Sequence, residues 1–176
     1  MKKLLKNKSF WGYFIPALLL ILFILFLYYR GSGIKLSSHE SSYKSVGYFV
    51  GGSPSSDLDI RRVRWHKHSG FERVVFDCYR YDGVLGRKSY ILSSDTGGYE
   101  IGKEKKDSLE IDGEIKGYRS FSATFPSFSK SKLINSIEIL KEDNGAYLFT
   151  IHLKKSTPYK VFTLSNPARI VIDLKD

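Results

Sequence analysis

The sequence predicts an all-β protein, a two-sheet β-sandwich preceded by a single N-terminal transmembrane helix. Two observations favour the sandwich. A strand–turn–strand pattern occurs twice, and the second copy follows the first after about 74 residues, as in a weakly duplicated two-sheet fold. A separate observation predicts the helix: residues 10–29 form one apolar run without a charge. Elsewhere the chain shows no amphipathic helical pattern.

The two hairpins are visible as alternation of apolar and polar residues. In the first, Arg61–Trp65 alternates, and the return strand Phe71–Tyr79 follows a short turn. In the second, Ile137–Leu140 is followed by a turn ending in Gly145 and by the return strand Ala146–Lys154. These patterns predict two antiparallel pairs, one in each half of the domain.

Further strands are predicted around these hairpins. Apolar triplets at Tyr90–Leu92 and Leu109–Ile111 are candidate strands, and the C-terminal segment 158–174 shows a strand, a Ser-Asn-Pro turn and a β-branched strand. We expect the charged segment 102–107 to be a solvated loop, and the Ser- and Phe-rich segment 120–132 to be an irregular loop.

The domain organisation follows from composition. Residues 1–9 form a basic tail, 10–29 a membrane span, 30–56 a flexible Ser/Gly-rich linker in which 46–50 is the one short strand candidate, and 57–176 the sandwich. About 20 apolar residues match the ~30 Å hydrocarbon core of a bilayer. A cleavable signal peptide is the alternative, but the run is long for one and no Ala-x-Ala-like site follows it.

Charge predicts the orientation of this span. Four lysines precede it and only Arg30 follows closely, so we expect the N-terminus in the cytoplasm and the domain on the outer, periplasmic or wall-facing side. Of the formal charge of +10, the first 56 residues hold seven Lys or Arg against Glu40 alone. The domain itself therefore has an ordinary mixed surface, which argues against nucleic acid as a partner.

The strongest local motif is Arg, three apolar residues, then Asp. It occurs as Arg73–Asp77 after Gly70 and again as Arg169–Asp173 after Asn166-Pro167. With the hairpins around it, this pattern resembles the AMIN family, and more closely its AMIN-like branch, over 57–176. The resemblance implies a sandwich of two similar sheets in a bacterial envelope protein. It also implies a non-catalytic module that targets its protein to peptidoglycan, since in amidases hydrolysis resides in a separate zinc domain.

The repeated motif supplies the first candidate binding residues, Arg73 and Arg169. Residues four apart in a strand share a face, so each Arg lies on the same side as the Asp that follows it. They are either surface charges that pair across the sheet or bidentate sites for the carboxylates of peptide stems. Arg62 and Arg64 allow a similar choice: charges that protect an edge strand, or a patch for an anionic wall polymer or lipid headgroups.

Aromatic and polar side chains supply the remaining candidates. Phe121, Phe125 and Phe128 lie in the Ser-rich segment without a burial period, which makes them candidates for sugar contacts. His66 and His68 have a spacing compatible with a metal, but exposed turn histidines are the simpler interpretation. Cys78 falls in a strand pattern and is expected to be buried.

These observations favour a non-catalytic binding module for peptidoglycan or another wall polymer. No nucleophile, metalloprotease or phosphate-binding motif occurs, and we expect no enzyme activity, metal or cofactor. The alternative is a protein-interaction or scaffolding module of an envelope complex. The sequence leaves the oligomeric state open.

Overall fold

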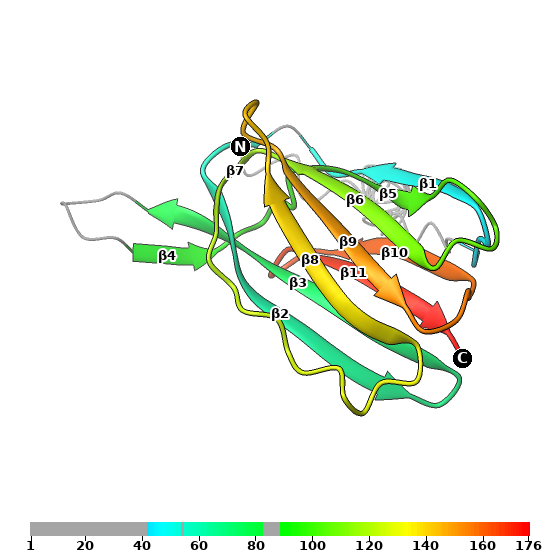
Figure 1. Cartoon of the computed structure of the whole chain (residues 1–176). Helices are drawn as coiled ribbons and strands as arrows, with labels where there is room; N and C mark the ends of the chain where they lie inside the picture. Colours follow the sequence, from blue (N-terminus) through cyan, green and yellow to red (C-terminus); the bar gives the residue numbers. More distant parts are fainter. Residues whose placement is uncertain (1–41, 54, 83–88) are drawn as a thin grey trace, which may run out of the picture. The chain divides into compact units, whose positions relative to one another are not determined.

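The computed structural model describes residues 42–53, 55–82 and 89–176. These residues form eleven β-strands in two sheets, and none of them forms a helix that could cross a membrane. The predicted span 10–29 and most of the predicted linker lie outside the described residues. Figure 1 shows the two sheets stacked face to face, which confirms the predicted all-β, two-sheet architecture.

One sheet has five strands, all antiparallel, in the order β1-β5-β6-β9-β8. Its strands are β1 (Gly47–Gly51), β5 (Gly98–Lys103), β6 (Glu110–Lys116), β8 (Ile134–Lys141) and β9 (Tyr147–Leu153). The predicted second hairpin is β8–β9 of this sheet, and the triplet at 109–111 marks the start of β6.

The other sheet has six strands in the order β10-β11-β3-β2-β7, with β4 paired to β3. Its strands are β2 (Leu58–His68), β3 (Phe71–Asp82), β4 (Ser89–Leu92), β7 (Tyr118–Phe121), β10 (Tyr159–Leu164) and β11 (Arg169–Lys175). All pairs are antiparallel except β2–β7, which is parallel. The first predicted hairpin is β2–β3, and the C-terminal pair is β10–β11, so the two hairpins found in the sequence belong to different sheets.

The core lies between the two sheets and is apolar. Alternation along each strand sends every second side chain inward, and the Phe76 and Phe149 rings meet across the gap with centroids 5.1 Å apart. Ile170, Ile172 and Leu174 of β11 are fully buried in this layer. Burial of this kind, at about 25 cal/mol per Å² of apolar surface, is the main stabilising contribution in a domain of this size.

The folded part begins before Asp57, within the segment that we expected to be a linker. Lys44 and Tyr159 exchange two backbone hydrogen bonds of 2.8 Å beside β10, and β1 then pairs with β5 of the opposite sheet. The buried hydroxyl of Tyr159 accepts from the Lys103 backbone N–H at 3.0 Å and donates to the Gly47 carbonyl. This segment therefore contacts both sheets along one side, and the strand candidate at 46–50 corresponds to β1.

The charged segment 102–107 is not wholly a solvated loop, because Lys103 is fully buried at the end of β5. Its ammonium donates to the carbonyls of Ser108 at 3.0 Å and Thr157 at 3.2 Å. Desolvation lowers the pKa of this ammonium. Charge alone suggested exposure, and no local sequence pattern indicates that backbone carbonyls surround this side chain.

The irregular segment after β7 is fixed by one buried carboxylate. Glu72 on β3 accepts from the Trp65 indole at 3.0 Å, from the Ser131 hydroxyl and from the Lys132 backbone N–H at 2.7 Å. A buried carboxylate is tolerated when several donors satisfy it. Glu72 thus holds a long loop, which has no strand of its own beyond Phe121, against the sheet.

Candidate functional site

The repeated Arg–Asp motif comes together on the outer face of the six-stranded sheet. Strands β3 and β11 are antiparallel neighbours, with Arg73 opposite Asp173 and Arg169 opposite Asp77. A motif with a cation at one end and an anion at the other matches its own copy when the copy runs in the opposite direction. The duplication therefore gives two charge pairs on one face, as the cross-strand interpretation of the sequence predicted.

The first pair is tightly satisfied. Arg73 Nε and Nη2 donate to the two Asp173 oxygens at 2.6 and 2.9 Å, and Lys160 Nζ lies 3.5 Å from the same carboxylate. The Arg73 guanidinium also lies over the rings of Phe71 and Phe162. The hydrogen bonds to Asp173 raise the pKa of Arg73, so it stays charged at any physiological pH. Arg73, a candidate ligand residue, is thus fully engaged within the sheet.

The second pair differs, because the Asp77 carboxylate is bound by Arg64 and not by Arg169, its neighbour on β11. Arg64 Nε and Nη2 donate to Asp77 at 2.9 and 2.6 Å. Arg169 Nε lies 4.0 Å from Asp77, too far for a hydrogen bond, and Arg62 occupies the position opposite Asp77 on β2. We call Arg62, Arg64 and Arg169 the arginine cluster; these are three of the candidate residues from the sequence.

Beneath these charges the sheet surface is apolar and covered. Val75 and Val171 oppose each other at the centre of the face and are only 6 % and 0 % exposed, although they point away from the core. Long charged side chains cover such residues with their aliphatic stems while the charged ends stay near water. The arginine cluster therefore stands on a rigid, packed floor, and this restricts the positions that the guanidinium groups can take.

The arginine cluster carries more positive charge than Asp77 neutralises. Arg169 Nε is buried without a hydrogen-bond partner, and no ion pair to Arg62 occurs within the described part of the chain. Asp77 can neutralise one of three positive charges. Guanidinium groups such as those of Arg62 and Arg169 can form charge-assisted and bidentate hydrogen bonds to an additional anion.

The phenylalanines proposed as sugar contacts pack inward. Phe128 is 8 % exposed and meets Trp65 edge to face at 6.2 Å. Phe121 and Phe125 are half-buried against the core, with their ring centroids 5.6 Å apart. These rings anchor the long loop, and Phe128 is not available to a ligand. The loop lacks an alternation period because its strand pairing ends at Phe121, and from there it runs beside β2, from Ile60 to Trp65, without joining a sheet.

The remaining reactive side chains are engaged or buried. The His68 ring stacks on Phe71 at 4.5 Å, and His66 lies 6.5 Å from His68. Among the described residues, no three His, Cys, Asp or Glu side chains are grouped so that they could hold a metal. Cys78 is buried as expected, and burial raises the pKa of its thiol to about 11, which makes it a poor nucleophile.

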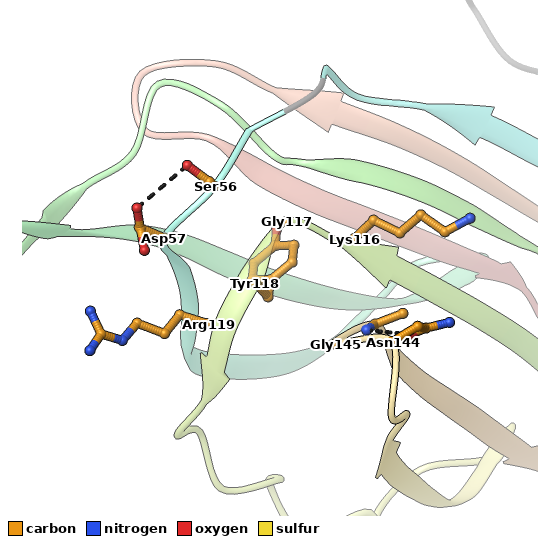
Figure 2. Close-up of a pocket in the computed structure, with 9 residues that line it drawn as sticks. Ser56, Asp57, Lys116, Gly117, Tyr118, Arg119, Asn144 and Gly145 are labelled. Atoms are coloured by element: carbon orange, nitrogen blue, oxygen red, sulfur yellow. Dashed lines mark hydrogen bonds between the residues drawn. The ribbon is translucent and has the colours of Figure 1, made fainter.

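A pocket of about 600 Å³ opens at one end of the sandwich, between the strand junction at 116–119, residues 56–57 and the turn at 144–146. Figure 2 shows the Lys116 and Arg119 side chains pointing away from each other on either side of Tyr118. The Tyr118 hydroxyl is turned inward and donates to the Thr96 carbonyl. The charged groups around the pocket do not converge on one point, so its geometry defines no ligand.

The described residues thus form a small all-β sandwich with a charged face on its six-stranded sheet. A family model described as the AMIN-like domain matches residues 58–176, and the chain therefore belongs to the AMIN-like family. Domains of this family are in general non-catalytic modules of the cell envelope. No curated protein and no solved structure matches the chain.

Proposed function

We propose that the domain binds an anionic polymer of the cell wall, peptidoglycan, through the arginine cluster. The observation that carries this proposal is the cationic excess around Asp77, where Arg169 Nε has no hydrogen-bond partner and lies 4.0 Å from the carboxylate, and where no ion pair to Arg62 occurs among the described residues. Peptide stems of peptidoglycan present carboxylates, and planar guanidinium groups bind carboxylates in bidentate geometry.

The shape of the face supports a polymer ligand. A sheet surface holds its side chains at fixed spacings, and here the spacing is maintained by the covered valines and by the Arg73–Asp173 pair. A repetitive polymer can engage such a face at several points, each of them weak, and gain avidity from their number.

We further propose that residues 10–29 anchor the chain in the cytoplasmic membrane with the N-terminus inside. The support is the apolar run with its lysine asymmetry. The short segment before Lys44 would then keep the domain close to the outer side of the membrane, within reach of the adjacent wall. A reporter that folds only outside the cytoplasm, fused after Asp176, should be active, whereas a cytoplasm-only reporter should not.

The binding proposal is tested by co-sedimentation of the purified full-length chain with wall sacculi in a neutral detergent. We expect sedimentation without other proteins, and a decrease as salt rises, because exposed ionic contacts are screened. The variant Arg62→Gln/Arg169→Gln should sediment at least about tenfold less, since each charge-assisted contact contributes roughly 1.5–3 kcal/mol at best.

The matched control removes two exposed cations elsewhere, as Lys105→Gln/Lys106→Gln, and should sediment like the unmodified chain. Sacculi stripped of covalently attached phosphate polymers distinguish the two anion sources: binding that survives the treatment indicates carboxylates, and binding that is lost indicates phosphates. Equal loss in both variants would refute the arginine cluster as the site.

A further inference from the structure

The outer face of the five-stranded sheet carries charge of the opposite sign. One row of residues crosses all five strands in register: Val50, Glu100, Glu114, Leu148 and Leu140. Two like charges stand directly opposite each other at its centre, an arrangement that destabilises a sheet. Both ends are apolar and open to solvent, with Val50 75 % and Leu140 63 % exposed. The free domain gains nothing from either feature.

The neighbouring row adds an exposed aromatic ring. Tyr48 on β1 is opposite Gly102 on β5, which is opposite Asp112 on β6. A Cβ at Gly102 would lie 2.7 Å from the Tyr48 ring, so the absence of a side chain allows this ring to lie over the sheet. Tyr48 remains 40 % exposed and borders a hollow of about 340 Å³. The hollow is lined by Tyr48, Glu100, Asp112, Glu114, Leu148 and Thr150, with Gly113 and Phe149.

The acids of this face are partly paired, and Glu100 is the exception. Lys116 pairs with Glu114 at 2.9 Å, and Asp112 accepts a hydrogen bond from Thr150 at 2.9 Å. No ion pair to Glu100 occurs within the residues that the structure describes. Glu110 and Glu138 flank His152 on the same face, at 3.3 and 3.5 Å. We call the two rows, with Glu110, Glu138 and His152, the acidic face.

We propose that the acidic face is a docking surface for a lysine- or arginine-rich segment of a partner protein. Such side chains combine an apolar stem with a cationic end. The stems would cover Val50 and Leu148, and the cations would lie between Glu100 and Glu114 and against the Tyr48 ring, which attracts cations. Charge complementarity of this kind steers association and excludes polyanions.

The proposal goes beyond wall binding, because it uses the opposite face of the sandwich and a partner of opposite charge. A second copy of the chain is a weaker fit. On the six-stranded face of a second copy, Arg73 and Arg64 are already paired with Asp173 and Asp77. Docking of that face would also cover the arginine cluster. Sheet faces on opposite sides allow wall and partner protein to be bound at the same time.

The test uses the full-length chain in a neutral detergent and a fluorescent eight-residue peptide of alternating Lys and Leu, followed by anisotropy. We expect saturable binding that weakens with salt, and much weaker binding of peptides with Glu in place of Lys or Ser in place of Leu. The variant Glu100→Gln/Glu114→Gln should bind at least about tenfold more weakly, as should Val50→Ser/Leu140→Ser. The melting temperature of the Gln variant should not fall, so lost binding would not reflect unfolding.

Two control variants test whether the peptide binds at the acidic face. Asp107→Asn/Asp143→Asn removes two exposed acids from turns and should change peptide affinity less than about twofold, as should Arg62→Gln/Arg169→Gln. Equal weakening in the turn variant would overturn the proposal in favour of general charge attraction. Concentration-dependent dimerisation in sedimentation equilibrium that is lost in Glu100→Gln/Glu114→Gln would overturn it in favour of a second copy as the occupant.

Discussion

The two outer faces of the sandwich treat their charges in opposite ways. On the six-stranded sheet, Arg73 and Asp173 alternate in sign across the strands, and the valines between the charges are covered. On the five-stranded sheet, Glu100 is opposite Glu114 and the apolar ends of the row are open. The strands that carry these charges are antiparallel neighbours on both faces, so the backbone does not cause the difference. The Arg73–Asp173 pair satisfies its own charges and contributes to stability. Like charges that stand together, as Glu100 and Glu114 do, are instead suited to a partner of opposite charge.

The largest expected effect is the difference in unfolding free energy between substitutions on the inner and the outer side of β11. Ile172→Ala removes a fully buried core side chain and should cost roughly 2–5 kcal/mol in the free energy of unfolding. Val171→Ala, the adjacent residue beneath the charged stems, should cost less, about 1–2 kcal/mol by the number of methylenes removed.

Urea unfolding at neutral pH provides the measurement, and the exposed Val50→Ala is the control, with a change within about 0.5 kcal/mol. Equal losses at 171 and 172 would show that the outer face is packed as tightly as the core. An unchanged free energy for Ile172→Ala would contradict the inward direction of this side chain.

Stability should fall at alkaline pH because of the core, not because of either face. Burial raises the pKa of the Cys78 thiol from 9.0 to about 11, so the unfolded chain loses this proton first. Its contribution is complete below about pH 9 and is lost as the pH rises toward 11, by about 1–3 kcal/mol. Tyr118, whose pKa burial also raises, acts in the same direction.

The check is the difference in unfolding free energy between about pH 8 and pH 11, in the unmodified chain and in Cys78→Ala. The alkaline loss should be smaller in the variant, whatever its stability at pH 8. An identical loss would assign the alkaline sensitivity to other groups. The stabilities of variants on the two faces should therefore be compared below pH 9, where this thiol is protonated in the folded and the unfolded chain.

Asp77→Asn tests the charge pairing of the six-stranded sheet. It leaves three arginines without a carboxylate, and we expect a loss of about 1–3 kcal/mol, partly restored by salt. Asp112→Asn on the acidic face keeps the hydrogen-bond acceptor for Thr150, and should change stability by about 0.5 kcal/mol or less. Thermal unfolding at two salt concentrations separates these outcomes. A similar response of both variants would remove the contrast between the faces.

The sequence predicted the elements that carry a strong local pattern. Alternation gave the β2–β3 and β8–β9 hairpins, and the repeated Arg–Asp motif placed its charges on one face of each strand. Sequence spacing could not predict that the two copies pair with each other, because this depends on which strands become neighbours. Val75 and Val171 fitted the outer face by period, but their burial there depends on side chains from other strands.

Other expectations failed where long-range contacts override local composition. Lys103 is buried because carbonyls from other segments surround it. The strand candidate at 46–50 did form β1, but it belongs to the folded domain and not to a linker, because β5 supplies its hydrogen bonds. Phe128 looked free because its loop has no period, yet the ring fills the space beside Trp65. The acidic face is spread over five strands, so no single segment displays it, although the alternating acids of β6 are one visible part.

The smallest expected effect is a gain of stability. Glu100→Gln removes one of the two carboxylates that oppose each other on β5 and β6, and cross-strand like charges cost about 0.2–1 kcal/mol. We therefore expect Glu100→Gln to unfold at a higher urea concentration than the unmodified chain. Glu100→Lys, which places a cation opposite Glu114, should gain as much or more. The difference between the variant and the unmodified chain should shrink as salt rises, because the repulsion is screened. A loss of stability in Glu100→Gln would mean that this carboxylate is engaged within the domain, and the acidic face would then lose the unpaired charge on which the docking proposal rests.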